Sequence, residues 1–243
     1  MHRFVALILL LSSAAWSAPT IEDGTILRPR FVTEQGTFNA GTAFAVDVNG
    51  KVLVVTALHL FGPAGGLEKQ IEGDQVPAFT KSIFLRDAFT NADHGTAHNG
   101  LTLADTHPMG DDAVGDIAAF EAKVLTGLDK LDSKAKALKP VHLATATPKK
   151  GDVVFIAAQF SADKDLRTRE AKVVEINDKW LFFEYTDAGL DIAGTNGAPV
   201  LNEEGQVVGI NLGGGKMKDG KLVGSANPLS AIKKRLTGAV PAE

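Results

Sequence analysis

Residues 191–210, DIAGTNGAPVLNEEGQVVGI, combine a short glycine-rich turn with a proline and a valine-rich run. Gly194 and Gly197 bracket the turn, and Asn196 and Gly197 both tolerate a positive φ. A turn of this kind lets backbone N–H groups converge on an anion, although many glycine-rich turns only reverse the chain. The stretch therefore predicts a tight turn leading into a strand, and it leaves open whether the turn binds a ligand.

Most of the remaining chain has the pattern of short β-strands. The runs GTAFAVDV and KVLVVTA, within residues 41–57, flank Asn49 and Gly50, and Asn–Gly between β-branched runs is the strongest local signal for a hairpin. Further strands are predicted at residues 81–86, 116–120, 152–158, 171–176, 180–185, 199–201, 206–212 and 221–226. Many short strands separated by Gly, Asn and Asp turns indicate an all-β barrel or sandwich.

Two stretches have a helical pattern. Residues 123–138 are rich in Lys, Leu and Ala and end before Pro140, whereas residues 228–236 begin with a proline and stop near Gly238. The first stretch lies near the middle of the chain, which predicts two β halves joined by a linker. Residues 71–110 contain polar loop material, including DHGTAHNG, to which the pattern assigns no element.

The N-terminus has the pattern of a secretory signal. His2 and Arg3 precede the apolar run 4–11, and small residues lead to Ala15, Trp16 and Ser17. A membrane anchor would need about 20 apolar residues to cross the bilayer, and this run is much shorter. We therefore expect cleavage after Ser17 and a secreted or periplasmic protein that does not remain in the membrane.

The composition of the 243-residue chain excludes several classes of metal site, nucleophile and binding partner. It contains no cysteine, which excludes zinc–thiolate sites, iron–sulfur clusters and cysteine nucleophiles, and leaves stability to burial alone. The formal net charge is −4, which argues against nucleic acid as a partner. The basic runs 134–139 and 233–235 are interpreted as solvated helix faces.

Two isolated residues are candidates for acid–base chemistry. His59 ends the strand-like run VLVVTALH, where an imidazole is either a hydrogen-bonded core group or a base at the edge of a sheet. Asp116 opens the apolar strand of AVGDIAAFEA, where a carboxylate commonly serves only to start a strand. Neither residue alone indicates an active site.

Taken together, the three motifs resemble the trypsin-like, chymotrypsin-fold serine proteases, in which the catalytic residues follow the chain order His, Asp, Ser. TALH resembles the family block around the base, GDIAAF the block around the aspartate, and GTNGAPVL the block G-x-S-G-G-P-V-L. The closing KLVGSANPLSAIKKRL is similar to the last strand and helix of bacterial members without disulfides. The resemblance spans about residues 36–236.

The resemblance implies an all-β fold of two six-stranded antiparallel β-barrels with a short C-terminal helix and a cleft between the barrels. The predicted divisions are a signal peptide at 1–17, an N-terminal barrel at 18–122, a linker at 123–148, and a C-terminal barrel with its helix at 149–243. We expect a monomer.

The last block departs from the family at the nucleophile. Aligning Pro199 with the family proline places Asn196 where the serine stands. A serine hydroxyl gives up its proton to the base that Asp116 orients, whereas an amide has no such oxygen. Loss of this nucleophile costs on the order of 10⁶ in turnover in a comparable triad. An alternative explanation is that Asn196 is only a turn residue.

Thr195 is the alternative nucleophile. Its hydroxyl lies one residue early, and the corresponding residue of the family faces inward, away from the base. Thr195 also stands where zymogen-activated members have an acidic residue that pairs with a new N-terminus, so we do not expect that activation switch here.

The resemblance also implies a site for peptides. Gly194 and Asn196 are matched to the N–H donors of the oxyanion hole. Asn211, Leu212 and Gly213 belong to the segment matched to the edge strand that pairs with an extended peptide. Leu190 is matched to the base of the specificity pocket, which weakly favours an apolar ligand side chain.

The remaining histidines suggest a metal site only weakly. His94, His98 and His107, with Asp93, could cluster in the long loop, but their spacing matches no strict ligand pattern. We therefore expect solvated loop residues, no metal and no cofactor.

Three functions remain open at this point. The first is an inactive protease homologue that binds a peptide or protein in the cleft, and the second is an active serine-type endopeptidase. The third is a structural or regulatory module whose former site is idle.

Overall fold

The computed structural model describes residues 17–103, 106–108, 113–122, 135–161 and 166–240. The predicted signal peptide lies outside this range except for Ser17, as do residues 123–134 of the first predicted helix. Residues 135–138, the described end of that stretch, form no helix, and Arg235 is buried, so the prediction of solvated helix faces is wrong for these residues. In the part of the chain that the structure describes, no helix is long and apolar enough to cross a membrane.

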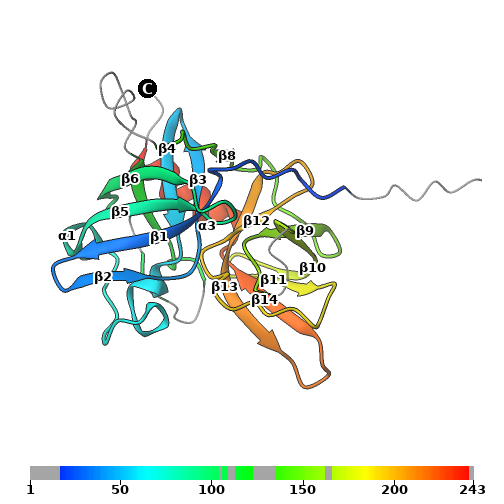
Figure 1. Cartoon of the computed structure of the whole chain (residues 1–243). Coiled ribbons are helices and arrows are strands. Elements are labelled where there is room, and N and C mark those ends of the chain that lie inside the picture. Colours follow the sequence, from blue (N-terminus) through cyan, green and yellow to red (C-terminus); the bar gives the residue numbers. More distant parts are fainter. Residues whose placement is uncertain (1–16, 104–105, 109–112, 123–134, 162–165, 241–243) are drawn as a thin grey trace, which may run out of the picture.

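The first barrel consists of six antiparallel strands in the order β1-β5-β6-β7-β4-β3, and pairing of β3 with β1 closes it (Figure 1). A short strand, β2, extends the sheet beside β1, and β8 pairs with β3 in parallel. The bounds are β1 Ile26–Thr33, β2 Gly36–Asn39, β3 Ala43–Val48, β4 Lys51–Thr56, β5 Thr80–Asp87, β6 Asp93–Gly100, β7 Ala118–Ala122 and β8 Val141–His142.

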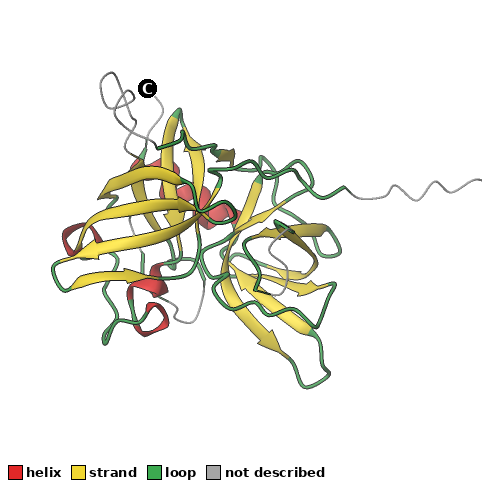
Figure 2. Ribbon diagram, viewed as in Figure 1, coloured by secondary structure: helices red, strands yellow, loops and turns green. Residues whose placement is uncertain are grey.

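The second barrel is closed by six antiparallel strands in the order β10-β11-β14-β13-β12-β9. Their bounds are β9 Val153–Ala157, β10 Thr168–Ile176, β11 Leu181–Tyr185, β12 Pro199–Leu201, β13 Val207–Lys216 and β14 Leu222–Ala226. The helical elements are short, as Figure 2 shows: η1 Leu58–Phe61, η2 Pro63–Gly65, α1 Val76–Phe79 and α3 Leu229–Ala239. The predicted fold class, two antiparallel barrels with a short C-terminal helix, is confirmed.

The predicted hairpin joins β3 to β4. Asn49 and Gly50 have φ angles of 53° and 80°, and Val48 pairs with Lys51. Positive φ at both turn positions matches the right-handed twist of the two strands. The turn residues therefore set the register that carries β4 toward His59.

The polar segment at residues 93–100 is a strand and not loop material. This segment is β6, which pairs with β5 on one side and β7 on the other. Its sequence has weak strand propensity, but two flanking strands satisfy its backbone groups, and tertiary context overrides propensity. His94 is buried in this strand, so the expectation that it is a solvated loop residue is wrong.

One apolar cluster links both barrels to α3. Phe44 and Val55 contribute from the first barrel, Phe155 and Ile210 from the second, and Ile232 from the helix. Each barrel also has an apolar cluster of its own. Because the shared cluster is continuous, the helix fixes one barrel against the other, and we expect the two barrels to unfold together.

Substitution of Ile232 tests this coupling. Ile232→Ala removes a fully buried side chain from the shared cluster and should lower the free energy of unfolding by about 2–5 kcal/mol. Ser230→Ala, at an exposed position on the same helix, should change it by less than about 0.5 kcal/mol. Calorimetry should show one transition for every variant, and two separated transitions would contradict the coupling.

Candidate active site

His59 lies in η1, immediately after β4 leaves the first barrel. Its side chain is buried, and Asp116, two residues before β7, is fully buried beside it. The Asp116 carboxylate accepts a hydrogen bond from His59 Nδ1 at 2.7 Å with one oxygen and from the His59 backbone N–H at 2.8 Å with the other. Two bonds to one carboxylate fix both the position of His59 and the orientation of its ring.

These contacts also determine which ring nitrogen carries the proton. Asn196 Nδ2 lies 2.9 Å from His59 Nε2. An amide nitrogen can only donate, so Nε2 must accept, and Nδ1 then carries the proton that Asp116 receives as a hydrogen bond. Among the described residues, Asn196 is the only hydrogen-bond partner of Nε2.

The turn that carries Asn196 belongs to the second barrel but is held by the first. Thr42 donates its backbone N–H to the Asn196 carbonyl at 2.8 Å and its hydroxyl to the Gly194 carbonyl at 2.8 Å. Gly197 has φ 85°, and a methyl group on it would overlap the Thr42 carbonyl oxygen. The turn therefore requires glycine here, both for its backbone angle and for close packing.

Two backbone amides of the turn have no internal acceptor. Within the described ranges, neither the Gly194 N–H nor the Asn196 N–H donates a hydrogen bond to the protein. Neighbouring free amides at a turn with positive φ can together stabilise a carbonyl oxygen or another anion. This property is consistent with the role that the family resemblance implies for both residues.

Thr195 points away from the histidine. Its side chain is fully buried, and its hydroxyl donates to the Ile192 carbonyl at 2.7 Å while accepting from Asn211 Nδ2 at 3.0 Å. Both partners belong to the second barrel. The hydroxyl is therefore occupied in the interior and does not face His59.

A cleft of about 410 Å³ lies next to Asn196, the hydrogen-bond partner of His59. It is lined by Gly41, Leu60, Ala64, Ile192, Ala193, Gly194, Asn196, Leu212, Gly213 and Gly214. Leu212 and Gly213, two of the residues predicted to contact a peptide, thus line this cleft. Asn211 is instead buried beneath the turn, where it contacts Thr195, and Leu190 packs in the core of the second barrel.

The two histidines of β6, His94 and His98, do not line the cleft. His94 Nδ1 lies 3.0 Å from the Lys136 carbonyl oxygen, and His98 Nε2 lies 2.9 Å from the Thr96 hydroxyl. Over the described ranges, no group of three or more His, Asp or Glu side chains is placed to bind a metal ion.

The sequence did not single out Thr42 or the residues of η2. Thr42 stands in GTAF, where nothing distinguishes a turn-holding threonine from an ordinary strand residue. Ala64, in η2, reaches the cleft only because the segment after His59 folds back beside it. In both cases a residue of the first barrel is brought next to residues 192–196, which are more than 100 positions away in the sequence.

A family model described as the trypsin-like peptidase domain matches residues 41–210. This chain belongs to that family. The match spans the predicted hairpin, His59, Asp116 and the turn at residues 194–198. No curated protein is significantly similar to the sequence.

Solved structures support the trypsin-like fold. A thermostable serine protease AL20 from an extremophilic microorganism aligns with a TM-score of 0.58 at 16% identity over 90% of this chain and 98% of that one. Kallikrein-related peptidase 10 aligns with a TM-score of 0.59 at 12% identity over 90% of this chain and 95% of that one. The active form of the Rv3671c protease from M. tuberculosis aligns with a TM-score of 0.53 at 13% identity over 90% of this chain and 82% of that one. At such identities the likeness shows the fold alone.

Proposed function

We propose that this protein binds an extended peptide segment in the cleft between its barrels without cleaving it. The hydrogen bond from Asn196 Nδ2 to His59 Nε2 carries the proposal. In a serine protease a hydroxyl faces this nitrogen and loses its proton to it. Here an amide fills the same position, and its nitrogen is not a nucleophile because its lone pair is delocalised into the carbonyl.

The position of the Asn196 amide also supports a blocked reaction centre. A methyl group on Gly213 would lie 3.1 Å from Asn196 Oδ1, so the amide extends from His59 toward the opposite wall of the cleft. We infer that it occupies part of the space in which the attacked carbonyl of a substrate would lie. A peptide would then bind with its backbone displaced from the Gly194 and Asn196 amides.

A free strand edge supports peptide binding. Residues 213–216 of β13 pair with β14, whereas the pairing of β12 with β13 ends at Ile210. Beyond that point β13 has no strand partner on its other side among the described residues. An exposed edge next to a cleft can accept an extended peptide as an added strand.

An active hydrolase using Thr195 is the second candidate, and its geometry is unfavourable. The hydroxyl would have to leave two buried hydrogen bonds and cross to the other side of the turn. An idle module, the third candidate, does not account for the open cleft or the free edge of β13.

Hydrolysis of fluorescein-labelled β-casein tests whether the nucleophile alone is missing. We expect no hydrolysis by the wild type and measurable hydrolysis by Asn196→Ser, because a serine hydroxyl would face His59 Nε2. Serine loss costs on the order of 10⁶ in turnover in a comparable triad, so even an imperfect restoration should raise the rate at least about 100-fold. The double variant His59→Ala/Asn196→Ser should be inactive again. Equal activity of wild type and Asn196→Ser would contradict the proposal.

Binding is tested separately on an array of immobilised peptides that tile β-casein. We expect the wild type to bind a subset of them and Ala64→Trp to bind at least about 10-fold more weakly, because Ala64 is exposed at the cleft wall and the indole would fill the cleft. Ser230→Trp places the same side chain at an exposed position of α3, away from the residues that line the cleft, and should bind like the wild type. Absence of binding, or equal binding by both variants, would favour the idle module.

A further inference from the structure

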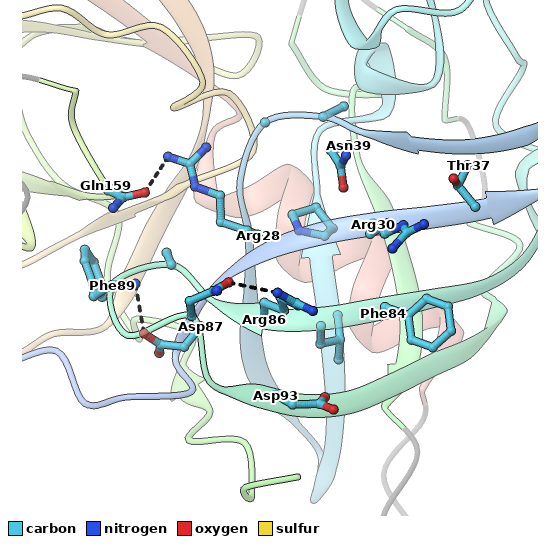
Figure 3. Close-up of a pocket in the computed structure, with 16 residues that line it drawn as sticks. Arg28, Arg30, Thr37, Asn39, Phe84, Arg86, Asp87, Phe89, Asp93 and Gln159 are labelled. Atoms are coloured by element: carbon cyan, nitrogen blue, oxygen red, sulfur yellow. Dashed lines mark hydrogen bonds between the residues drawn. The ribbon is translucent and has the colours of Figure 1, made fainter. Parts of the chain in front are cut away.

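A second groove lies outside the cleft, on the outer face of the first barrel. Its volume is about 860 Å³, and its walls come from β1, β2 and β5 together with the turn after β5. Figure 3 shows Arg28 extended toward Gln159 of the second barrel, while Arg30, Phe84 and Arg86 lie along the two central strands.

Three of the side chains that line this groove are arginines on adjacent positions of one sheet face. Arg28 of β1 stands directly opposite Arg86 of β5, and Arg30 is the next outward-facing residue of β1. Like charges directly opposite each other on neighbouring strands destabilise a sheet. The fold therefore maintains a pair of cations that would be more stable with an anion between them.

The protein itself supplies no such anion to the three arginines. Within the described ranges, no carboxylate lies within 4.0 Å of them. Arg28 Nη2 donates to Gln159 Oε1 at 2.8 Å, and Arg86 Nη1 donates to Asn91 Oδ1 at 3.4 Å. Neighbouring protein atoms desolvate the Arg28 guanidinium and lower its pKa, but an arginine keeps its charge at neutral pH.

The two carboxylates of the groove do not cancel this charge. Asp87 is buried, and it accepts hydrogen bonds from the backbone of Gly24, Phe89 and Thr90. Asp93 stands opposite Arg86 on β6, and one of its oxygens accepts the Gly95 N–H at 2.8 Å. The groove thus has an excess of positive charge in a protein whose formal net charge is −4.

The groove adjoins the cleft. Gly41 lines both, and a methyl group on Gly194 would lie 3.6 Å from Arg28 Nη1. The groove also contains an apolar surface, because the Phe84 side chain is 47% exposed opposite Arg30. A ligand that leaves the cleft past Gly194 would therefore meet Arg28 first, and then Arg86, Arg30 and Phe84.

We propose that this groove binds an acidic segment of the same peptide ligand that occupies the cleft. The proposal rests on the proposed function and adds the chemical class of the ligand: glutamate or aspartate side chains beside at least one apolar side chain. A guanidinium can bind a carboxylate with two parallel hydrogen bonds, and Phe84 offers a contact for the apolar group. A peptide is favoured over a polyanion such as nucleic acid because the groove continues into a cleft with a free strand edge.

Fluorescence anisotropy with a short fluorescein-labelled peptide of alternating glutamate and leucine tests the proposal. The wild type should bind it, and the double variant Arg28→Gln/Arg86→Gln should bind at least roughly tenfold more weakly, because two charge-assisted contacts are lost. Lys149→Gln/Lys150→Gln removes the same charge from exposed positions outside the groove and should bind like the wild type. Added salt should weaken binding to the wild type.

Several results would overturn the proposal. The first is that the wild type binds a matched peptide of alternating glutamine and leucine as tightly as the acidic peptide. The second is that the lysine double variant loses as much affinity as the arginine double variant. The third is that the wild type binds a single-stranded oligonucleotide more tightly than the acidic peptide, and that this binding depends on the same arginines. The midpoint of thermal unfolding should not fall in the arginine variant, because the substitutions relieve like-charge repulsion. If the arginine variant binds the peptide more weakly and also unfolds at a lower temperature than the wild type, this result would count against a direct role of the arginines.

The same probe separates this proposal from the proposed function. The probe needs only the groove, so Ala64→Trp should bind it like the wild type. If the β-casein peptides do not bind but the acidic probe does, peptide binding in the cleft fails and the groove remains an acidic-peptide site. If the β-casein peptides bind and the acidic probe does not, the groove proposal alone is wrong.

Discussion

The two hydrogen bonds that His59 donates to the Asp116 carboxylate determine what the cleft can do. One orients the imidazole through Nδ1 and the other holds its backbone, so the Nε2 lone pair points toward the turn at residues 194–198. This geometry would serve equally to remove a proton from a hydroxyl or to accept a hydrogen bond from an amide. Position 196 holds an asparagine whose amide nitrogen lies 2.9 Å from Nε2, and the proposal that the cleft binds a peptide without cleaving it rests on this residue.

The rest of the molecule keeps this arrangement in place across two barrels. His59 and Asp116 come from the first barrel and Asn196 from the second, so their distances depend on how the barrels pack. Thr42 holds the turn with two hydrogen bonds, and the apolar cluster around Ile232 fixes the barrels together. A chain without disulfides therefore positions its candidate site by packing and by hydrogen bonds from both backbone and side chains.

Much of the fold was predictable because local signals agreed with tertiary structure. The Asn49–Gly50 turn, the valine-rich runs and the proline before α3 each specify their own element. β1 was missed although Leu27, Pro29 and Phe31 alternate with outward-facing Arg28 and Arg30, because a proline within a run argues against a strand. β6 could not have been predicted, since its polar sequence forms a strand only between β5 and β7.

The candidate site also combines features that the local sequence predicts with features that only tertiary packing creates. The order of His59, Asp116 and the glycine-rich turn was visible in the sequence, but the contacts of Thr42 and the burial of Leu190 depend on barrel packing. The arginine groove could not be predicted either, because Arg28 and Arg86 become neighbours only through strand register.

Intact-protein mass spectrometry after treatment with a fluorophosphonate tests most directly whether His59 faces a usable nucleophile. The wild type should show no adduct, and a stoichiometric adduct on a residue of the cleft or on Thr195 would contradict the absence of a nucleophile.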